Sequence, residues 1–167
     1  MKSFIESQFG YCSLIWMYHS RRLNNKINRL HERALRIVHR DYDNTFEELL
    51  SLDNSHTIYQ RNLQKLAIEM YKVLNDLSPR FMKKLFPFST NNYNLRHKKI
   101  FKTENIRTVH YGIETISYWG PKIWESLPCD IKYSDNLQIF KKKIKSWKPV
   151  GCNCNIFKTY IHHVGFL

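Results

Sequence analysis

Residues 111–147 read Y-G-I-E-T-I-S-Y-W-G-P-K-I-W-E-S-L-P-C-D-I-K-Y-S-D-N-L-Q-I-F-K-K-K-I-K-S-W. Gly120 and Pro121 predict a sharp turn here, and the preset φ of Pro121 favours a short helix that starts there and ends before Pro128. After a polar gap, Ser134 or Asp135 is expected to cap a last helix. Its apolar residues recur at spacings of three and four: Leu137, Phe140, Ile144 and Trp147.

The residues around this stretch complete the predicted fold. Residues 108–111 form a short β-like run, which Gly112 stops. Upstream, helical periodicity dominates, so the sequence predicts a mainly α fold: a helical bundle, then the β-like segment, then the C-terminal helix. The other faces of that last helix carry four cations: Lys141, Lys142, Lys143 and Lys145.

Residues 21–40 form the clearest amphipathic helix. The predicted buried stripe consists of Leu23, Ile27, Leu30, Ala34 and Ile37. A basic stripe repeats one residue earlier: Arg22, Lys26, Arg29, Arg33, Arg36 and Arg40. One residue is about 100° of rotation, so the basic stripe is expected to flank the buried stripe. Two interpretations stay open: Arg and Lys stems covering the edge of the core, or a helix laid along a phosphate backbone.

Three further helical segments are predicted. Residues 4–18 form a helix whose second half is apolar on every side, so it expects neighbours that an isolated chain lacks. Residues 45–50 form a short helical segment that opens with a capping box of Thr45 and Glu48, and Thr57 and Gln60 form a second box. The second box opens a helix over residues 58–75, which we interpret as core together with the short turn after Pro79.

Residues 87–108 change in texture. Helical periodicity disappears, and cations alternate with aromatic residues. Single-stranded nucleic acid binds to such segments when bases stack on rings and phosphates meet cations. Tyr93 or Phe101 would then stack, and the cations would be Arg96, Lys98, Lys99 and Lys102. An ordinary exposed linker explains the same pattern equally well.

Charge limits the possible partners. The 167 residues hold 27 Lys and Arg against 14 Asp and Glu, a formal net charge of +13, which indicates a polyanion such as nucleic acid. Nucleic acid is the leading candidate and a membrane surface the second, and no membrane partner is expected. No apolar run approaches the roughly 20 residues that span a bilayer. Four cysteines without a framework spacing favour a reducing, intracellular location. No nucleophile–base pair, phosphate loop or carboxylate cluster can be assembled, so no catalytic residues are predicted.

Specific motifs along nearly the whole chain carry a family resemblance. They include E-S-Q-F at 6–9, Y-G at 111–112, G-P-K-I-W at 120–124, L-P at 127–128 and F-K-K-K at 140–143. With these motifs the chain resembles the C-terminal, post-palm region of reverse transcriptases from non-LTR (LINE-type, jockey-like) retrotransposons. The resemblance implies that the helical bundle is thumb-like and grips RNA, DNA or an RNA–DNA hybrid beside a polymerase palm that this chain lacks.

The resemblance also bears on chemistry and location. The intact enzyme would be an RNA-directed DNA polymerase that uses magnesium in the cytoplasm and nucleus, but its catalytic aspartates and endonuclease are not among these residues. This chain would be no enzyme in isolation and would need no cofactor. The alternative is a free-standing basic RNA- or DNA-binding module, or an inert retroelement remnant.

The tail resembles a degenerate form of the Cys knuckle that ends such proteins. Phe157 stands where a third Cys would be. No bound zinc is expected here, and the residues that could supply ligands to it are Cys152, Cys154, His162 and His163. The predicted organisation is a thumb-like bundle over 1–86, a basic linker over 87–108, a β-like and helical segment over 109–149, and this tail over 150–167.

Overall fold

The computed structural model describes residues 6–18, 21–90, 100–103, 106–108, 112 and 115–147. Within these ranges the chain is mainly α-helical and contains no strand, which confirms the mainly α prediction. Of the predicted β-like run, Thr108 belongs to no regular element, and residues 109–111 lie outside the described ranges. The described part holds one isolated antiparallel bridge, between Phe88 and Phe101.

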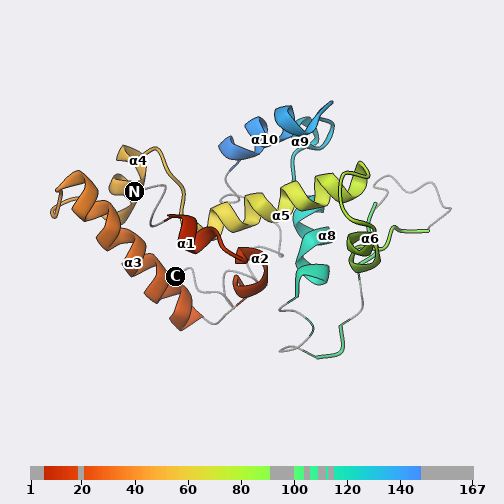
Figure 1. The fold of residues 1–167 in the computed structure, drawn as a ribbon, viewed down its shortest axis with the longest axis horizontal. Helices are drawn as coiled ribbons and strands as arrows, with labels where there is room; N and C mark the ends of the chain where they lie inside the picture. The colour runs from red at the N-terminus through yellow and green to blue at the C-terminus, as the bar shows by residue number, and fades with distance from the viewer. Residues whose placement is uncertain are drawn as a thin grey trace. The chain divides into compact units, whose positions relative to one another are not determined.

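The chain divides into two compact units, and the division falls within α5 (Ile58–Leu74). The described residues up to Asn62 form the first unit (Figure 1), which contains α1 (Ser7–Gly10), α2 (Ser13–Trp16), α3 (Arg21–His39) and α4 (Phe46–Leu52). Those from Leu63 form the second unit, with α6 (Arg80–Leu85), α8 (Ile116–Ser126), α9 (Cys129–Lys132) and α10 (Leu137–Ser146). The predicted segment boundaries stay predictions.

The single helix predicted over residues 4–18 is wrong. Two short helices, α1 and α2, occupy the described part of that range. They are separated because Cys12 adopts a left-handed backbone with φ 45°, which no α-helix can continue through. The apolar residues of this range also differ in burial, although the sequence predicted an apolar surface on every side: Met17 and Tyr18 are buried, whereas Tyr11 and Ile15 are exposed.

The core of the first unit lies between α3 and α4. Leu35 of α3 packs with Leu49 and Leu50 of α4, and Phe46 covers their edge. The capping box predicted at Thr45 is confirmed: the Glu48 amide donates to the Thr45 hydroxyl, and the Thr45 amide donates to the Glu48 carboxylate over 2.7 Å. The cap fixes where α4 begins and therefore which leucines face α3.

Three helices end with the same backbone device. Arg40 after α3, Asn54 after α4 and Asp76 after α5 all have left-handed φ angles, of 50°, 48° and 59°. After each, the next amide donates to a carbonyl five residues back, as in Asp41 to Arg36 over 3.2 Å. This is the Schellman motif, which satisfies carbonyls that the helix end leaves free.

A chain of aromatic rings forms the core of the second unit. The Tyr71 ring of α5 stacks on Phe140 of α10, with centroids 4.3 Å apart, and Phe140 stacks on Trp124 of α8 at 6.1 Å. Phe101 meets Trp124 edge-on at 6.1 Å and stacks on Phe88 at 5.4 Å. Phe101 is therefore buried core and cannot stack on a base, which contradicts that alternative; the other alternative, Tyr93, lies outside the described ranges.

The Gly120–Pro121 turn is also wrong. Helix α8 begins at Ile116 and runs through Pro121, although proline removes one hydrogen bond from the ladder. The glycine has a packing reason instead: a Cβ there would lie 2.6 Å from Phe86 Cε1 and 2.8 Å from Met70 Sδ. Gly120 thus lets α8 approach the buried Met70 and Phe86 side chains closely.

Helix α10 has the predicted apolar pattern with a different cap. Phe140 and Ile144 are buried, and Leu137 and Trp147 are half-buried. Asn136, rather than Ser134 or Asp135, is the N-cap, and its side chain accepts from the Ile139 amide over 2.9 Å. Ser134 is unavailable because its hydroxyl donates to the Ile131 carbonyl and its own carbonyl accepts from the Tyr71 hydroxyl.

The long helix α5 confirms most of the pattern predicted for residues 58–75. Its second capping box is present, because Thr57 and Gln60 exchange hydrogen bonds of 3.2 Å. The residues that its periodicity predicts to be buried are Tyr59, Leu63, Leu66, Ala67, Met70, Val73, Leu74 and Leu77. The first six are buried, whereas Leu74 is half-buried and Leu77 is exposed. The interpretation of the following turn as core is wrong, since Phe81 and Leu85 of α6 are exposed.

Candidate nucleic-acid interface

Helix α3 buries a different face from the predicted one. His31, Ala34 and Leu35 are buried, whereas Leu23, Leu30 and Ile37 are 46%, 53% and 70% exposed. Leu35 sets this rotation because it meets the leucines of α4. On a wheel of about 100° per residue, the basic stripe is then centred about 180° from the buried face. The prediction that it flanks the buried face is therefore wrong, and the stripe lies opposite that face.

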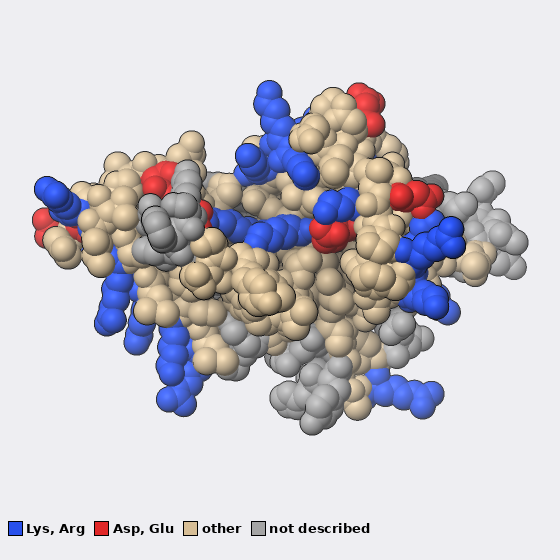
Figure 2. Space-filling view, in the orientation of Figure 1, with Lys and Arg blue, Asp and Glu red and all other residues tan. Residues whose placement is uncertain are grey.

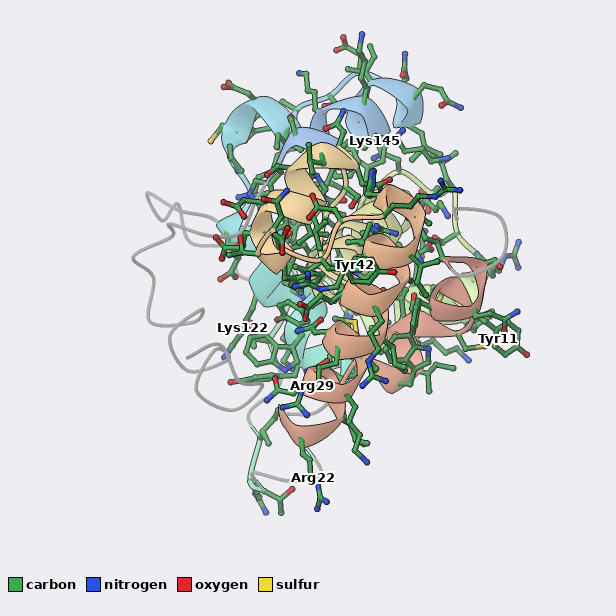
Figure 3. All side chains as sticks on the ribbon, turned by 90° about the vertical axis from the view of Figure 1, so that its left-hand side faces the viewer. Tyr11, Arg22, Arg29, Tyr42, Lys122 and Lys145 are labelled. Atoms are coloured by element: carbon green, nitrogen blue, oxygen red, sulfur yellow. The ribbon has the colours of Figure 1, made fainter. Side chains whose placement is uncertain are left out.

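Five cations of the stripe are exposed to solvent: Arg22, Lys26, Arg29, Arg33 and Arg40. Blue side chains project along α3 in Figure 2, and Figure 3 labels two of them, Arg22 and Arg29. None of the five forms an ion pair with a residue of the described ranges. From Arg22 to His39 the helix extends about 26 Å at about 1.5 Å per residue.

Arg36 differs from the other members of the stripe. Its guanidinium pairs with Glu32 at 2.8 Å and donates to the Tyr42 carbonyl at 2.6 Å. Those bonds fasten the residues that follow α3 to its last turn. We therefore assign Arg36 a structural role and exclude it from the candidate phosphate contacts.

The second unit carries its own cations. On α10, Lys142, Lys143 and Lys145 are exposed and Lys141 is half-buried. Lys143 Nζ donates to the Asp130 carbonyl over 2.7 Å, which ties α10 to α9. Lys102 is exposed beside the Phe88–Phe101 bridge, where its amide donates to the Pro87 carbonyl over 2.8 Å.

Several predicted residues cannot be placed. Tyr93, Arg96, Lys98 and Lys99 of the linker, and the zinc candidates Cys152, Cys154, His162 and His163, lie outside the described ranges. Both predictions stay predictions. Within the described ranges no cluster of three or more His, Cys, Asp or Glu side chains could hold a metal ion. In the same residues, no helix combines the length and the apolar character needed to cross a bilayer.

Helix α6 presents a candidate that the sequence did not reveal. The Phe81 ring is 62% exposed, and Arg80 and Lys84 beside it are exposed too. An exposed ring between two cations is what base stacking with phosphate contact requires. The sequence pattern concealed it because Leu77, Phe81 and Leu85 recur every four residues, as core residues also do.

His31, Asp41 and Glu48 of the first unit have shifted pKa values and add no positive charge to the basic stripe. The pKa of His31 is lowered to about 4, first by burial and then by the Arg61 cation, while Glu6 and Asp53 partly oppose this shift. His31 is therefore neutral near pH 7. Hydrogen bonds from the Asn44 and Thr45 amides lower the pKa values of Asp41 and Glu48, respectively. Both carboxylates stay ionised in the segment that follows α3.

No protein-family model, curated protein or solved structure matches this chain.

Proposed function

We propose that this chain binds RNA or an RNA–DNA hybrid through the basic stripe of α3. The observation that carries the proposal is the row of five exposed cations opposite the buried face, with no described ion-pair partner. A cation row of one sign attracts a polyanion and releases its counterions on contact. The lysines of α10 and the Phe81 site on α6 are additional contacts of the same kind.

The family resemblance supports a specific setting for this binding. In that setting the chain is the post-palm, thumb-like segment of a retrotransposon reverse transcriptase. It would hold the template while the absent palm performs magnesium-dependent polymerisation, and it would have no activity of its own. A free-standing binding module would bind nucleic acid equally well without a palm, so the binding test applies to both.

The test removes two cations from one helix at a time. The full chain is titrated into a fluorescent 20-nucleotide RNA at several salt concentrations. The double change Arg29→Gln with Arg33→Gln should lower affinity about tenfold and reduce the slope of log K against log salt by about 1.5, because each lost phosphate contact removes about 0.7–0.9.

A matched double in the second unit, Lys142→Gln with Lys145→Gln, changes the net charge equally. If the two doubles weaken binding to the same extent, α3 contributes no more than the additional α10 contacts do, and it is not the main interface. An unchanged slope in the α3 double would contradict the proposal directly. Circular dichroism checks that both variants keep their helices.

A further inference from the structure

Helix α3 carries an exposed row that nucleic-acid binding leaves unexplained. Leu23, Leu30 and Ile37 are seven residues apart, and all three are exposed. The surrounding sequence repeats with the same period, as R-L-N-N-K-I-N, R-L-H-E-R-A-L and R-I-V-H-R over residues 22–40. Each repeat places a cation directly before the aliphatic residue and another three residues after it.

A strict period of seven points to one kind of contact. Seven residues are about two turns of helix, so the row advances about 10.5 Å per repeat and drifts by only about 20°. A second helix presents apolar side chains at that spacing and can cross α3 at a shallow angle. A phosphate backbone is charged and offers no apolar surface against which aliphatic side chains could pack. The row therefore favours a helical partner.

Charge selects the character of that partner. The cations of each repeat lie on one side of the aliphatic row, whereas the other side is the edge of the buried face. Glu32 is the only acidic residue of α3, and it is paired with Arg36. A second copy of this chain would set cations against cations, at a formal net charge of +13 each. Like charges in direct opposition are destabilising.

We propose that the exposed face of α3 docks an acidic amphipathic helix from another protein. That helix carries an apolar residue every seven positions, which packs between Leu23, Leu30 and Ile37, and Asp or Glu along one flank only, which meets the cations. The proposal is independent of nucleic-acid binding. Since Arg29 and Arg33 serve both ligands, a bound acidic helix excludes nucleic acid from α3.

The test uses the full chain and a synthetic 21-residue helical peptide with Leu at every seventh position and Glu along one flank. Fluorescence anisotropy at about 0.1 M salt measures binding. The triple change Leu23→Ser, Leu30→Ser and Ile37→Ser should weaken peptide binding at least about tenfold and leave RNA affinity within about twofold. A peptide with Ser in place of each Leu should bind the wild-type chain as weakly.

A matched triple separates the row from general surface apolarity. Leu52, Leu77 and Leu85 are exposed aliphatic residues outside α3, and changing them to Ser should leave peptide binding unchanged. Because these positions and those of the row are exposed, circular dichroism should be unaltered; the single change Leu30→Ser gives the same direction if the α3 triple loses helix.

Four results would overturn the proposal. Three of them are no peptide binding up to about 1 mM, equal binding by the α3 triple or the Ser peptide, and an equal loss of RNA binding in the α3 triple. Phosphatidylserine vesicles form the last arm, because binding to them with the same dependence on Leu30 would assign the face to a lipid surface instead.

Discussion

The imidazole of His31 lies inside the first unit, and neither of its ring nitrogens makes a hydrogen bond to a described residue. His31 is fully buried, and its ring meets Phe46 edge-on with centroids 5.6 Å apart. A protonated imidazole there would lose its hydration without gaining a partner, which is why burial lowers its pKa to about 4. The nearby Glu6 carboxylate pairs with Arg61 over 2.8 Å, and the Arg61 cation lowers the pKa of His31 more than Glu6 raises it.

This histidine predicts acid sensitivity. Above about pH 6.5 the imidazole is neutral in both the folded and the unfolded chain. Below that pH the unfolded chain binds a proton at this histidine, whereas the folded chain does so only near a pH of about 4. The free energy of unfolding should therefore fall by about 2 kcal/mol between about pH 7 and about pH 5. Urea denaturation at the two pH values measures it. His31→Leu is the matched control and should flatten the profile; the same fall in both chains would assign it to other groups.

At the scale of elements, the positions of the helix ends could be predicted from the sequence only in part. Capping boxes are short sequence patterns with a fixed spacing, so those at Thr45 and Thr57 were predicted and are confirmed. The Schellman motifs at Arg40, Asn54 and Asp76 have no glycine at the left-handed position, so the usual sequence signal for a helix C-terminus was missing. The rotation of α3 was also hidden, because two overlapping sets of its residues have helical spacing and only contact with α4 selects one.

The end of α3 predicts a stabilising substitution. Arg40 has φ 50°, where a Cβ is unfavourable by about 1 kcal/mol relative to glycine. Arg40→Gly should therefore stabilise the chain by about 1 kcal/mol in urea denaturation. Arg40→Ala removes the same charge but keeps the Cβ, so it should give no such gain. Equal stabilities of the two variants would mean that charge, and not backbone conformation, governs this position.

At the scale of the whole molecule, repulsion among like charges opposes folding. The formal net charge is +13, and compaction brings those charges together. Raising NaCl from about 0.05 to about 0.5 M should increase the urea midpoint by screening that repulsion.

The α3 stripe offers the matched test of this effect. A variant with Gln at positions 22, 26, 29 and 33 loses four positive charges from exposed sites. Its salt-dependent increase should be about half as large, since the repulsion scales with the square of the net charge. An equal increase in both chains would show that salt acts through apolar surface instead.

The sequence by itself determined the class of fold and the chemistry of the surface. Periodicity and capping boxes follow from neighbours three or four residues apart, so α3, α4, α5 and α10 were predicted near their observed positions. The excess of Lys and Arg is a property of composition, and the cations of α3 had to gather on one side because their spacing is helical.

Tertiary structure alone decided which surfaces those residues occupy. Leu35 packing on α4 turned the basic stripe away from the core and exposed Leu23, Leu30 and Ile37. The aromatic chain buried Phe101, and Phe81 remained exposed although both are phenylalanines near cations. Gly120 proved to be a packing residue because Met70 and Phe86, far away in sequence, meet it. Burial depends on contacts between distant segments, and no local pattern encodes which of two apolar faces will find a partner.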